Sequence, residues 1–446
     1  MQFGFGRSDI TPRVGVQLYG YGPFLNRHST AVRTALYARA MAISDGQDTG
    51  VIASCELVGV SRGIADRTRA LASERCGIPA EHICIHCIHT HCGPTSKEAI
   101  GQGDPDGPYI ETLPVRIADA CVAAVADLKP GRLAHTVVPC EGIGYNREHD
   151  VRPSLEEALD ENWRPARTDI IDTEAHVLRI DGDQGMRGFA TYFSCHPVVG
   201  PAVQRHISSD FVGVATAMLE AEHPGTRGVF LQGCEGNTNS CVVHHPEQES
   251  LLALDVIASR YARQVRPGIG GAEPTDCDTL AFAQAQCTLP YAPLAEAELR
   301  EMLAKEEAIL TAAGVTDSAP DVARATVWAT GLRRELARIS AGTPIDDTFE
   351  LWAMRLGEIV LIGAPFEIMH IYKRRVQAAF DFPVLVMALC NGAEGYLPER
   401  ESFTMEGNYG AMRTPYMLGK TPFSPDVEDV VVEGMIDLVG RVSRPA

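Results

Sequence analysis

Two hydrophobic periodicities alternate along the chain, and this alternation constrains the fold more than any other feature. Short apolar runs rich in β-forming residues are followed by longer segments in which apolar residues recur every three or four positions. Strands are expected at residues 35–44, 50–57, 83–88, 173–180, 187–195, 228–232, 351–362 and 384–390. Helices are expected at residues 61–75, 109–128, 210–222, 247–264, 294–313, 366–380 and 427–442. This order predicts an α/β fold with a central mixed β-sheet flanked by helices.

The domain organisation is expected to be simple. No Ser/Gly/Pro-rich linker and no run of charge divides the 446 residues, which favours one large domain over residues 1–446. Residues 290–345 are an expected excursion, because 294–313 and 322–339 both show the periodicity of amphipathic surface helices. We interpret them as a helical hairpin that takes no part in the chemistry.

Composition narrows the class of partner. A net charge of −19 argues against nucleic acid and against stable association with an anionic membrane. No apolar run approaches the ~18 residues of a membrane span, and the start of the chain lacks the pattern of a signal peptide. The 13 cysteines, without the spacing of a small disulfide scaffold, indicate reduced thiols. We therefore expect a cytoplasmic protein with a small-molecule substrate; the oligomeric state stays open.

Three histidines stand where predicted strands end. His89 and His91 follow the run 83–88, and His196 follows the run 187–195 and precedes Pro197. In α/β sheets, chemistry gathers at the carboxyl ends of strands, and residues two apart on an extended segment point to the same side. Imidazole is a common zinc ligand and a good proton shuttle, so the pair could divide these tasks. Taken singly, each histidine could equally be a buried structural residue.

Nucleotide-binding motifs are missing. The sequence contains no Walker A loop and no strand-anchored Gly-x-Gly-x-x-Gly. The pairs Cys84/Cys87 and Cys241/His244 lack a second pair at zinc-finger spacing. Water activated by a metal is therefore the favoured nucleophile.

The segment from His89 to Pro94, His-Thr-His-Cys-Gly-Pro, resembles the neutral/alkaline non-lysosomal ceramidase family. Further motifs resemble the same family in the same order, over residues 3 to about 410. They are 6–12 (GRSDITP), 18–22 (LYGYG), 36–40 (LYARA), Asn146-Arg147, 193–197 (FSCHP), 208–210 (SSD), 231–233 (LQG) with Gly236-Asn237, and 396–398 (YLP) with Tyr409.

The resemblance implies a zinc site. In the family, a catalytic zinc is bound by the first His of the His-Thr-His motif, the His of the later His-Pro motif, a Glu and a Tyr. Carried over to this chain, His89, His196 and Tyr396 are the implied ligands. The positions of His91, Arg147 and Tyr409 match family residues that line the active site and contact the carbonyl and amide of the substrate.

The chain departs from the family at two positions. Asn239 stands where the family has an active-site Ser, in the stretch Gly236-Asn237-Thr238-Asn239. Ala364 follows Gly363 where the family has the ligand Glu. Glu367, three residues later, is our candidate replacement, reaching the metal from the first turn of the helix expected at 366–380. We also expect this chain to lack the family's C-terminal immunoglobulin-like domain, because few residues follow Tyr409 in this sequence.

Together these features predict a zinc-dependent hydrolase that cleaves an amide bond in a small soluble substrate other than ceramide. His91 would shuttle the proton, Arg147 or Tyr409 would stabilise the oxyanion, and Asn239 would orient the substrate. The same pocket could instead act on an ester, lactone or glycosidic bond, with Glu235 and Glu56 as the candidate acids. A non-catalytic protein that kept the fold is the third possibility.

Overall fold

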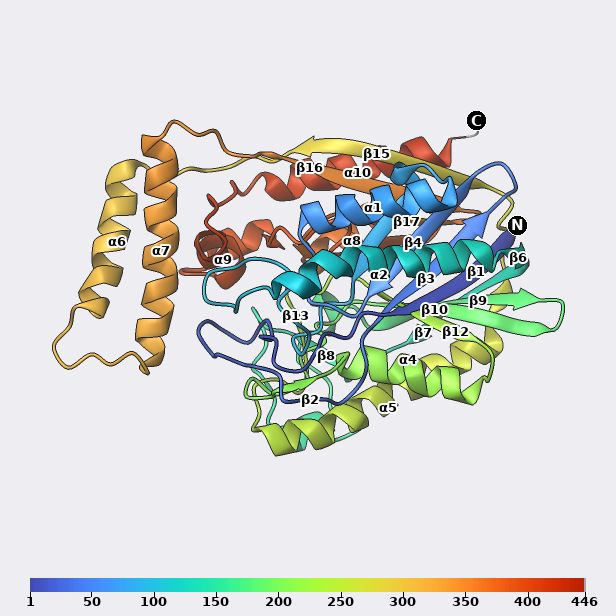
Figure 1. Cartoon of the computed structure of the whole chain (residues 1–446), viewed down its shortest axis with the longest axis horizontal. Helices are drawn as coiled ribbons and strands as arrows, with labels where there is room; N and C mark the ends of the chain where they lie inside the picture. Colours follow the sequence, from blue (N-terminus) through green and yellow to red (C-terminus); the bar gives the residue numbers. More distant parts are fainter. Residues whose placement is uncertain (445–446) are drawn as a thin grey trace.

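The computed structural model describes residues 1–444, and three larger β-sheets form its centre (Figure 1). The first sheet has the order β5 (Ile83–Cys87), β4 (Thr49–Cys55), β3 (Tyr37–Ser44), β1 (Gln2–Asp9) and β6 (Lys129–Pro130). The second has the order β12 (Arg227–Gln232), β10 (Gly185–Phe193), β9 (Glu174–Gly182), β7 (Arg132–Pro139) and β14 (Glu273–Pro274). The third has the order β15 (Leu280–Thr288), β16 (Thr348–Leu356), β17 (Ile359–Gly363) and β19 (Val384–Met387).

Each sheet is antiparallel except for one parallel pair at an edge. These pairs are β4 with β5, β10 with β12, and β17 with β19. Parallel neighbours need a crossover connection, and here the connections contain α1 (Arg62–Cys76), α4 (Asp210–Glu222) and α8 (His370–Gln377). The α/β class with mixed sheets and flanking helices is thus confirmed, although the strands are divided among three sheets instead of one.

The remaining elements cover these sheets or join the loops between them. In Figure 1, α2 lies with α1 on the first sheet, α5 with α4 on the second, and α10 on the third. These helices are α2 (Gly107–Ala126), α5 (Glu247–Gly271) and α10 (Val427–Ser443), and the shorter ones are α3 (Leu155–Leu159) and α9 (Thr414–Met417). Short strand pairs are β2 (Ala31–Val32) with β11 (His206–Ile207), β8 (Gly144–Asn146) with β13 (Thr238–Ser240), and β18 (Glu367–Ile368) with β20 (Tyr396–Leu397).

Strand β1 illustrates how the sequence specifies this layering. Side chains alternate between the two faces of a strand, and Phe3 and Phe5 lie in the core that the three sheets share. Gly4 and Gly6 face α2 on the other side, where an added Cβ would lie 2.1 Å from the carbonyl oxygens of Ala124 and Ala120. Glycine at alternate positions therefore lets a helix pack directly on the strand backbone.

His86 joins the three sheets at the ends of their parallel strands. This histidine is fully buried on β5, and its Nδ1 lies 2.8 Å from the carbonyl oxygen of Ala388, just after β19. Its Nε2 accepts a hydrogen bond of 2.8 Å from the backbone N–H of Gln232, the last residue of β12. Both ring nitrogens are satisfied, and burial lowers the pKa of His86 to about 4, so the ring is neutral. The carboxyl ends of β5, β12 and β19 are thereby held together.

Two expected elements differ from the structure. The run 351–362 is two strands, β16 and β17, joined by a turn in which Gly357 has a φ of 59°. The helix expected at 366–380 begins only at His370. Glu367 lies instead in β18, which pairs in parallel with β20. The carbonyl oxygen of Ile368 in β18 also accepts a hydrogen bond from the backbone N–H of Gly236. These tertiary hydrogen bonds outweigh the local helical periodicity of the segment.

Helices α6 (Glu296–Leu310) and α7 (Pro320–Ser340) pack side by side at the end of the molecule opposite both termini (Figure 1). Gly331 on α7 lies against α9, and an added Cβ there would come within 1.9 Å of the carbonyl oxygen of Tyr416. Within residues 1–444, none of the helices combines the length and the apolar character that crossing a bilayer requires.

We expect Gly331→Ala to lower the free energy of unfolding by about 1–3 kcal/mol, because the methyl group overpacks a backbone contact. Gly440→Ala is the matched control, since Gly440 also lies in a helix but has open space where a Cβ would be. That control is expected to stabilise by up to ~1 kcal/mol through helix propensity. Urea unfolding measures both, and equal stabilisation by the two substitutions would contradict the close packing of α7 on α9.

Candidate metal centre

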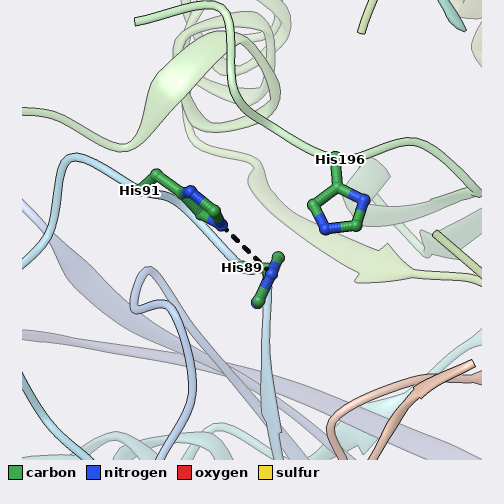
Figure 2. A group of neighbouring side chains, drawn as sticks. All are labelled: His89, His91 and His196. Carbon is green, nitrogen blue, oxygen red and sulfur yellow. Dashed lines mark hydrogen bonds between the residues drawn. The ribbon is translucent and has the colours of Figure 1, made fainter. Parts of the chain in front are cut away.

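In each of the three sheets, a loop after a strand of the parallel pair contributes one polar side chain, and the three side chains meet at one place. His89 follows β5, His196 follows β10, and Glu367 follows β17 by four residues. Figure 2 shows the three histidine rings turned toward one another, with the centroids of His89 and His196 4.8 Å apart. The Nε2 atoms of His91 and His89 are 3.2 Å apart. The carboxyl ends of the strands are where α/β proteins gather chemistry, and the buried position of His196 and His89 adds a dry environment.

The carboxylate of Glu367 completes this convergence. Its Oε2 lies 3.3 Å from Nε2 of His89 and 3.2 Å from Nε2 of His196. Burial alone would raise the pKa of the Glu367 carboxyl, but positive charge at the two Nε2 atoms, whether from a proton or from a metal ion, lowers this pKa well below its usual range. Ala364 leaves no gap, since its backbone hydrogen-bonds with Met387 and Cys390 and its side chain is fully buried. Glu367 thus reaches the histidines from a strand, and the expected reach from a helix is wrong.

The hydrogen bonds behind the two histidines test whether a metal fits. Nδ1 of His89 lies 2.6 Å from the carbonyl oxygen of Val58, and Nδ1 of His196 lies 2.7 Å from that of Glu235. A carbonyl oxygen only accepts, so the proton of each neutral ring lies on Nδ1 and the lone pair on Nε2. Burial lowers the pKa of His196 to about 4, which keeps that ring neutral. Two lone pairs and a carboxylate oxygen then converge, an arrangement that a cation stabilises.

His91 differs from the other two histidines in the hydrogen bonding of its Nδ1 atom. Its Nδ1 is buried and has no hydrogen-bond partner among the described residues. Metal-bound histidines almost always donate their second N–H to a carbonyl or carboxylate, as His89 and His196 are placed to do. His91 is therefore free to exchange a proton, although its nearest ring nitrogen lies close enough to the other two for a shared metal.

His89 also departs from the expected backbone. Its φ is 72°, in the left-handed region, whereas we expected an extended segment that would point His89 and His91 to one side. The backbone N–H of His89 bonds to the carbonyl oxygen of Leu57 at 2.9 Å, which fixes this turn. Such conformations are rare outside glycine and concentrate at functional sites.

Tyr396 lies beside Glu367 because the two residues are direct partners in the β18–β20 pair. Directly paired residues on neighbouring strands point to the same face of the sheet. The ring of Tyr396 lies under the guanidinium of Arg147, 5.2 Å from centroid to Cζ, and Tyr409 lies 5.7 Å from the same group. Arg147 also donates from Nη2 to the carbonyl oxygen of Gly236 at 2.6 Å, so its position is fixed.

A second short strand pair places Asn239 in the site. It lies on β13 opposite Tyr145 of β8, and a further bridge pairs it with His196. Arg147 follows β8 directly, and its backbone N–H bonds to the carbonyl oxygen of Asn237 at 2.9 Å. The β8–β13 pair therefore brings Arg147 and Asn239 to the cavity that the histidines line.

A single cavity of about 910 Å³ joins these groups. All eight residues nominated from the sequence line it: His89, His91, Arg147, His196, Asn239, Glu367, Tyr396 and Tyr409. Helix α7 lines it as well, through Arg324, Val327 and Trp328. The helical hairpin, to which the sequence assigned no chemistry, thus borders the cavity, and no local sequence signal separates this face of α7 from an ordinary amphipathic one.

The two acids considered for a glycosidic reaction lie outside this lining. Glu56 is buried in an ion pair with Arg39, with Oε1 2.8 Å from Nε. Glu235 is also buried, and neither carboxyl oxygen has a hydrogen-bond partner among the described residues. Burial, reinforced by Glu367, raises the pKa of Glu235 well above its usual range, so this carboxyl is neutral.

Comparison with known proteins gives a consistent result. Residues 1–287 match the family described as "Neutral/alkaline non-lysosomal ceramidase, N-terminal". The crystal structure of a neutral ceramidase from Pseudomonas aeruginosa superposes with a TM-score of 0.72 at 20% identity, over 98% of this chain and 73% of that chain. A ceramidase complexed with C2 gives a TM-score of 0.71 at 20% identity, over 100% of this chain and 76% of that chain.

Proposed function

The chain belongs to the neutral/alkaline non-lysosomal ceramidase family, and on that premise we propose that it is a zinc-dependent hydrolase that cleaves an amide bond in a small molecule. The observation that carries the proposal is the convergence of His89 Nε2, His196 Nε2 and the Glu367 carboxylate at one cavity. Two histidines and a carboxylate, with a further position open, are a common catalytic zinc set. Tyr396 beside Glu367 is the proposed fourth protein ligand, which would require the site to expand beyond four positions so that water also binds.

A zinc ion held there supplies a Lewis acid that activates water for attack near neutral pH. His91 accepts and returns the proton, because its neutral ring lies beside His89 and its Nδ1 is not engaged elsewhere. Arg147 stabilises the negative charge that develops on the carbonyl oxygen, with Tyr409 beside its guanidinium. Asn239, which lies on β13, orients the substrate by hydrogen bonding.

We propose a substrate other than ceramide. Asn239 stands where the family has an active-site Ser, so the group that faces the substrate here is an amide. An amide side chain offers both donors and acceptors and has no hydroxyl to act as a nucleophile. A short-chain ceramide is therefore expected to be a poorer substrate than a simple N-acyl compound.

The fold and the metal do not determine the bond that is cleaved. Glycoside hydrolysis requires two carboxyl groups that flank the scissile bond, and neither Glu56 nor Glu235 lines the cavity. Ester and lactone hydrolysis use the same polarised carbonyl as amide hydrolysis, so these bonds belong in the substrate panel.

The test combines metal analysis with a panel of N-acyl amides, esters, glycosides and a short-chain ceramide. We expect purified protein to contain one tightly bound zinc, to lose activity on chelation, and to regain it with added Zn²⁺. Amides should be hydrolysed faster than glycosides and faster than the ceramide. Protein that holds no stoichiometric metal and gains no activity with zinc would favour the non-catalytic alternative.

A further inference from the structure

Lys97 is a buried lysine that faces the candidate metal site without a partner. Its side chain is only 6% exposed, and it lines the same cavity as His89 and Glu367. The loop that carries it is fixed, since Ser96 Oγ donates to the carbonyl oxygen of Gly59 at 2.6 Å. Cδ of Lys97 lies 3.6 Å from where a Cβ on Gly59 would be, so the lysine stem packs against this part of the backbone.

The ammonium group of Lys97 has no anionic partner in the part of the chain that the structure describes. Its closest described contact is the ring of Tyr19, whose centroid lies 5.4 Å from Nζ. The nearby Glu394 is already paired with Lys420. The stem of Lys97 is buried while its ammonium faces the cavity, so an anionic group of a ligand in the cavity would gain a charge-assisted hydrogen bond there.

The rest of the cavity fits a ligand with an apolar portion. Its lining includes hydrophobic side chains from several elements, namely Val198, Val243, Val327, Met405, Met417 and Leu418. Two further cations, Arg324 and Arg413, stack on Trp328 at 5.5 and 5.1 Å, and both are exposed. The lining also carries the acids Glu148, Asp317 and Glu367, so an anionic ligand is favoured by Lys97 and not by the overall charge of the cavity.

We propose that the substrate is an N-acyl amino acid or a similar amide, with an apolar acyl chain and a carboxylate that pairs with Lys97. This inference rests on the proposed amide hydrolysis and adds the class of substrate. A single lysine offers one compact positive charge, which matches a carboxylate, whereas phosphate groups are usually held by several donors such as bidentate arginines. Lys97 is thus assigned as a specificity-determining residue.

The test compares N-octanoylglycine with N-octanoylglycinamide, which replaces the carboxylate by a neutral amide of the same shape. The wild-type protein is expected to prefer the acid. Lys97→Met should lower kcat/KM for the acid by about 10- to 100-fold, the size of a charge-assisted hydrogen bond, and change the value for the glycinamide by less than about 3-fold. Lys305→Met, which removes the same charge from the exposed face of α6, is the matched control and should change neither.

Binding to the full-length protein separates this inference from the proposed reaction. Calorimetry should show tighter binding of N-octanoylglycine than of its glycinamide, and Lys97→Met should abolish that difference while Lys97→Arg retains part of it. Activity on neither compound together with Lys97-dependent binding would reject the hydrolase and keep the carboxylate site. Equal losses on both compounds, or a preference that disappears in Arg324→Met or Arg413→Met and not in Lys97→Met, would overturn the assignment of Lys97.

Discussion

Glu367→Gln is expected to lose most of its bound metal and nearly all of its activity while remaining folded. The substitution keeps the shape of the side chain but removes the negative charge on which the Nε2 atoms of His89 and His196 converge. Loss of a supporting hydrogen bond behind a metal ligand already costs ~10–100-fold in affinity, so loss of an anionic ligand should cost more. Since the metal is worth several kcal/mol in the transition state, kcat/KM should fall by on the order of 10³-fold.

Glu235→Gln is the matched control for this experiment. Glu235 is also a buried glutamate near the site, but its carboxyl is neutral and does not line the cavity. An amide in place of a neutral acid should therefore leave the metal bound. Mass spectrometry of metal content and circular dichroism would be measured on both variants. Full metal occupancy in Glu367→Gln, or metal loss confined to Glu235→Gln, would show that the wrong carboxylate has been assigned.

The histidines could be found from the sequence because two independent signals coincide at them. They follow predicted strands, and they match the His-Thr-His and His-Pro motifs of the ceramidase family. His89 and His196 each follow an apolar run, and the loops after parallel strands meet at one edge. Glu367 was harder to place, because the segment around it has helical periodicity. Its strand conformation depends on pairing with Tyr396 and on contact with Gly236, both distant in the sequence. Local periodicity does not register such pairings.

The surroundings of the site were not predictable for the same reason. Trp328 and Arg324 lie on a helix that the sequence describes only as amphipathic, and their place at the cavity depends on how α7 packs against α9. In the sequence, Lys97 cannot be distinguished from other loop lysines, and only the structure shows that it is buried. Burial and the partners of a charge are properties of the folded chain, so residues that matter through them become visible only in the structure.

His91→Ala is expected to keep its metal and lose turnover by ~10²–10⁴-fold, the range for a general acid or base. His91 lies 3.2 Å from His89 through Nε2, close enough for either of two roles, proton transfer or metal binding. The unpartnered Nδ1 favours proton transfer, since His89 and His196 both have a backbone carbonyl behind the ring and His91 has none among the described residues. Burial and the two neighbouring rings lower the pKa of His91, so its neutral ring is available as a proton acceptor.

Two further variants make this result decisive. His91→Gln fills the space beside Tyr21, which packs edge-on against His91 with ring centroids 5.1 Å apart, and it should show the same loss of turnover if proton transfer is the cause. His223→Ala removes an imidazole at the end of α4, outside the cavity lining, and should alter neither metal content nor rate. If His91→Ala instead loses its zinc, three histidines hold the metal. Another group that lines the cavity would then have to transfer the proton.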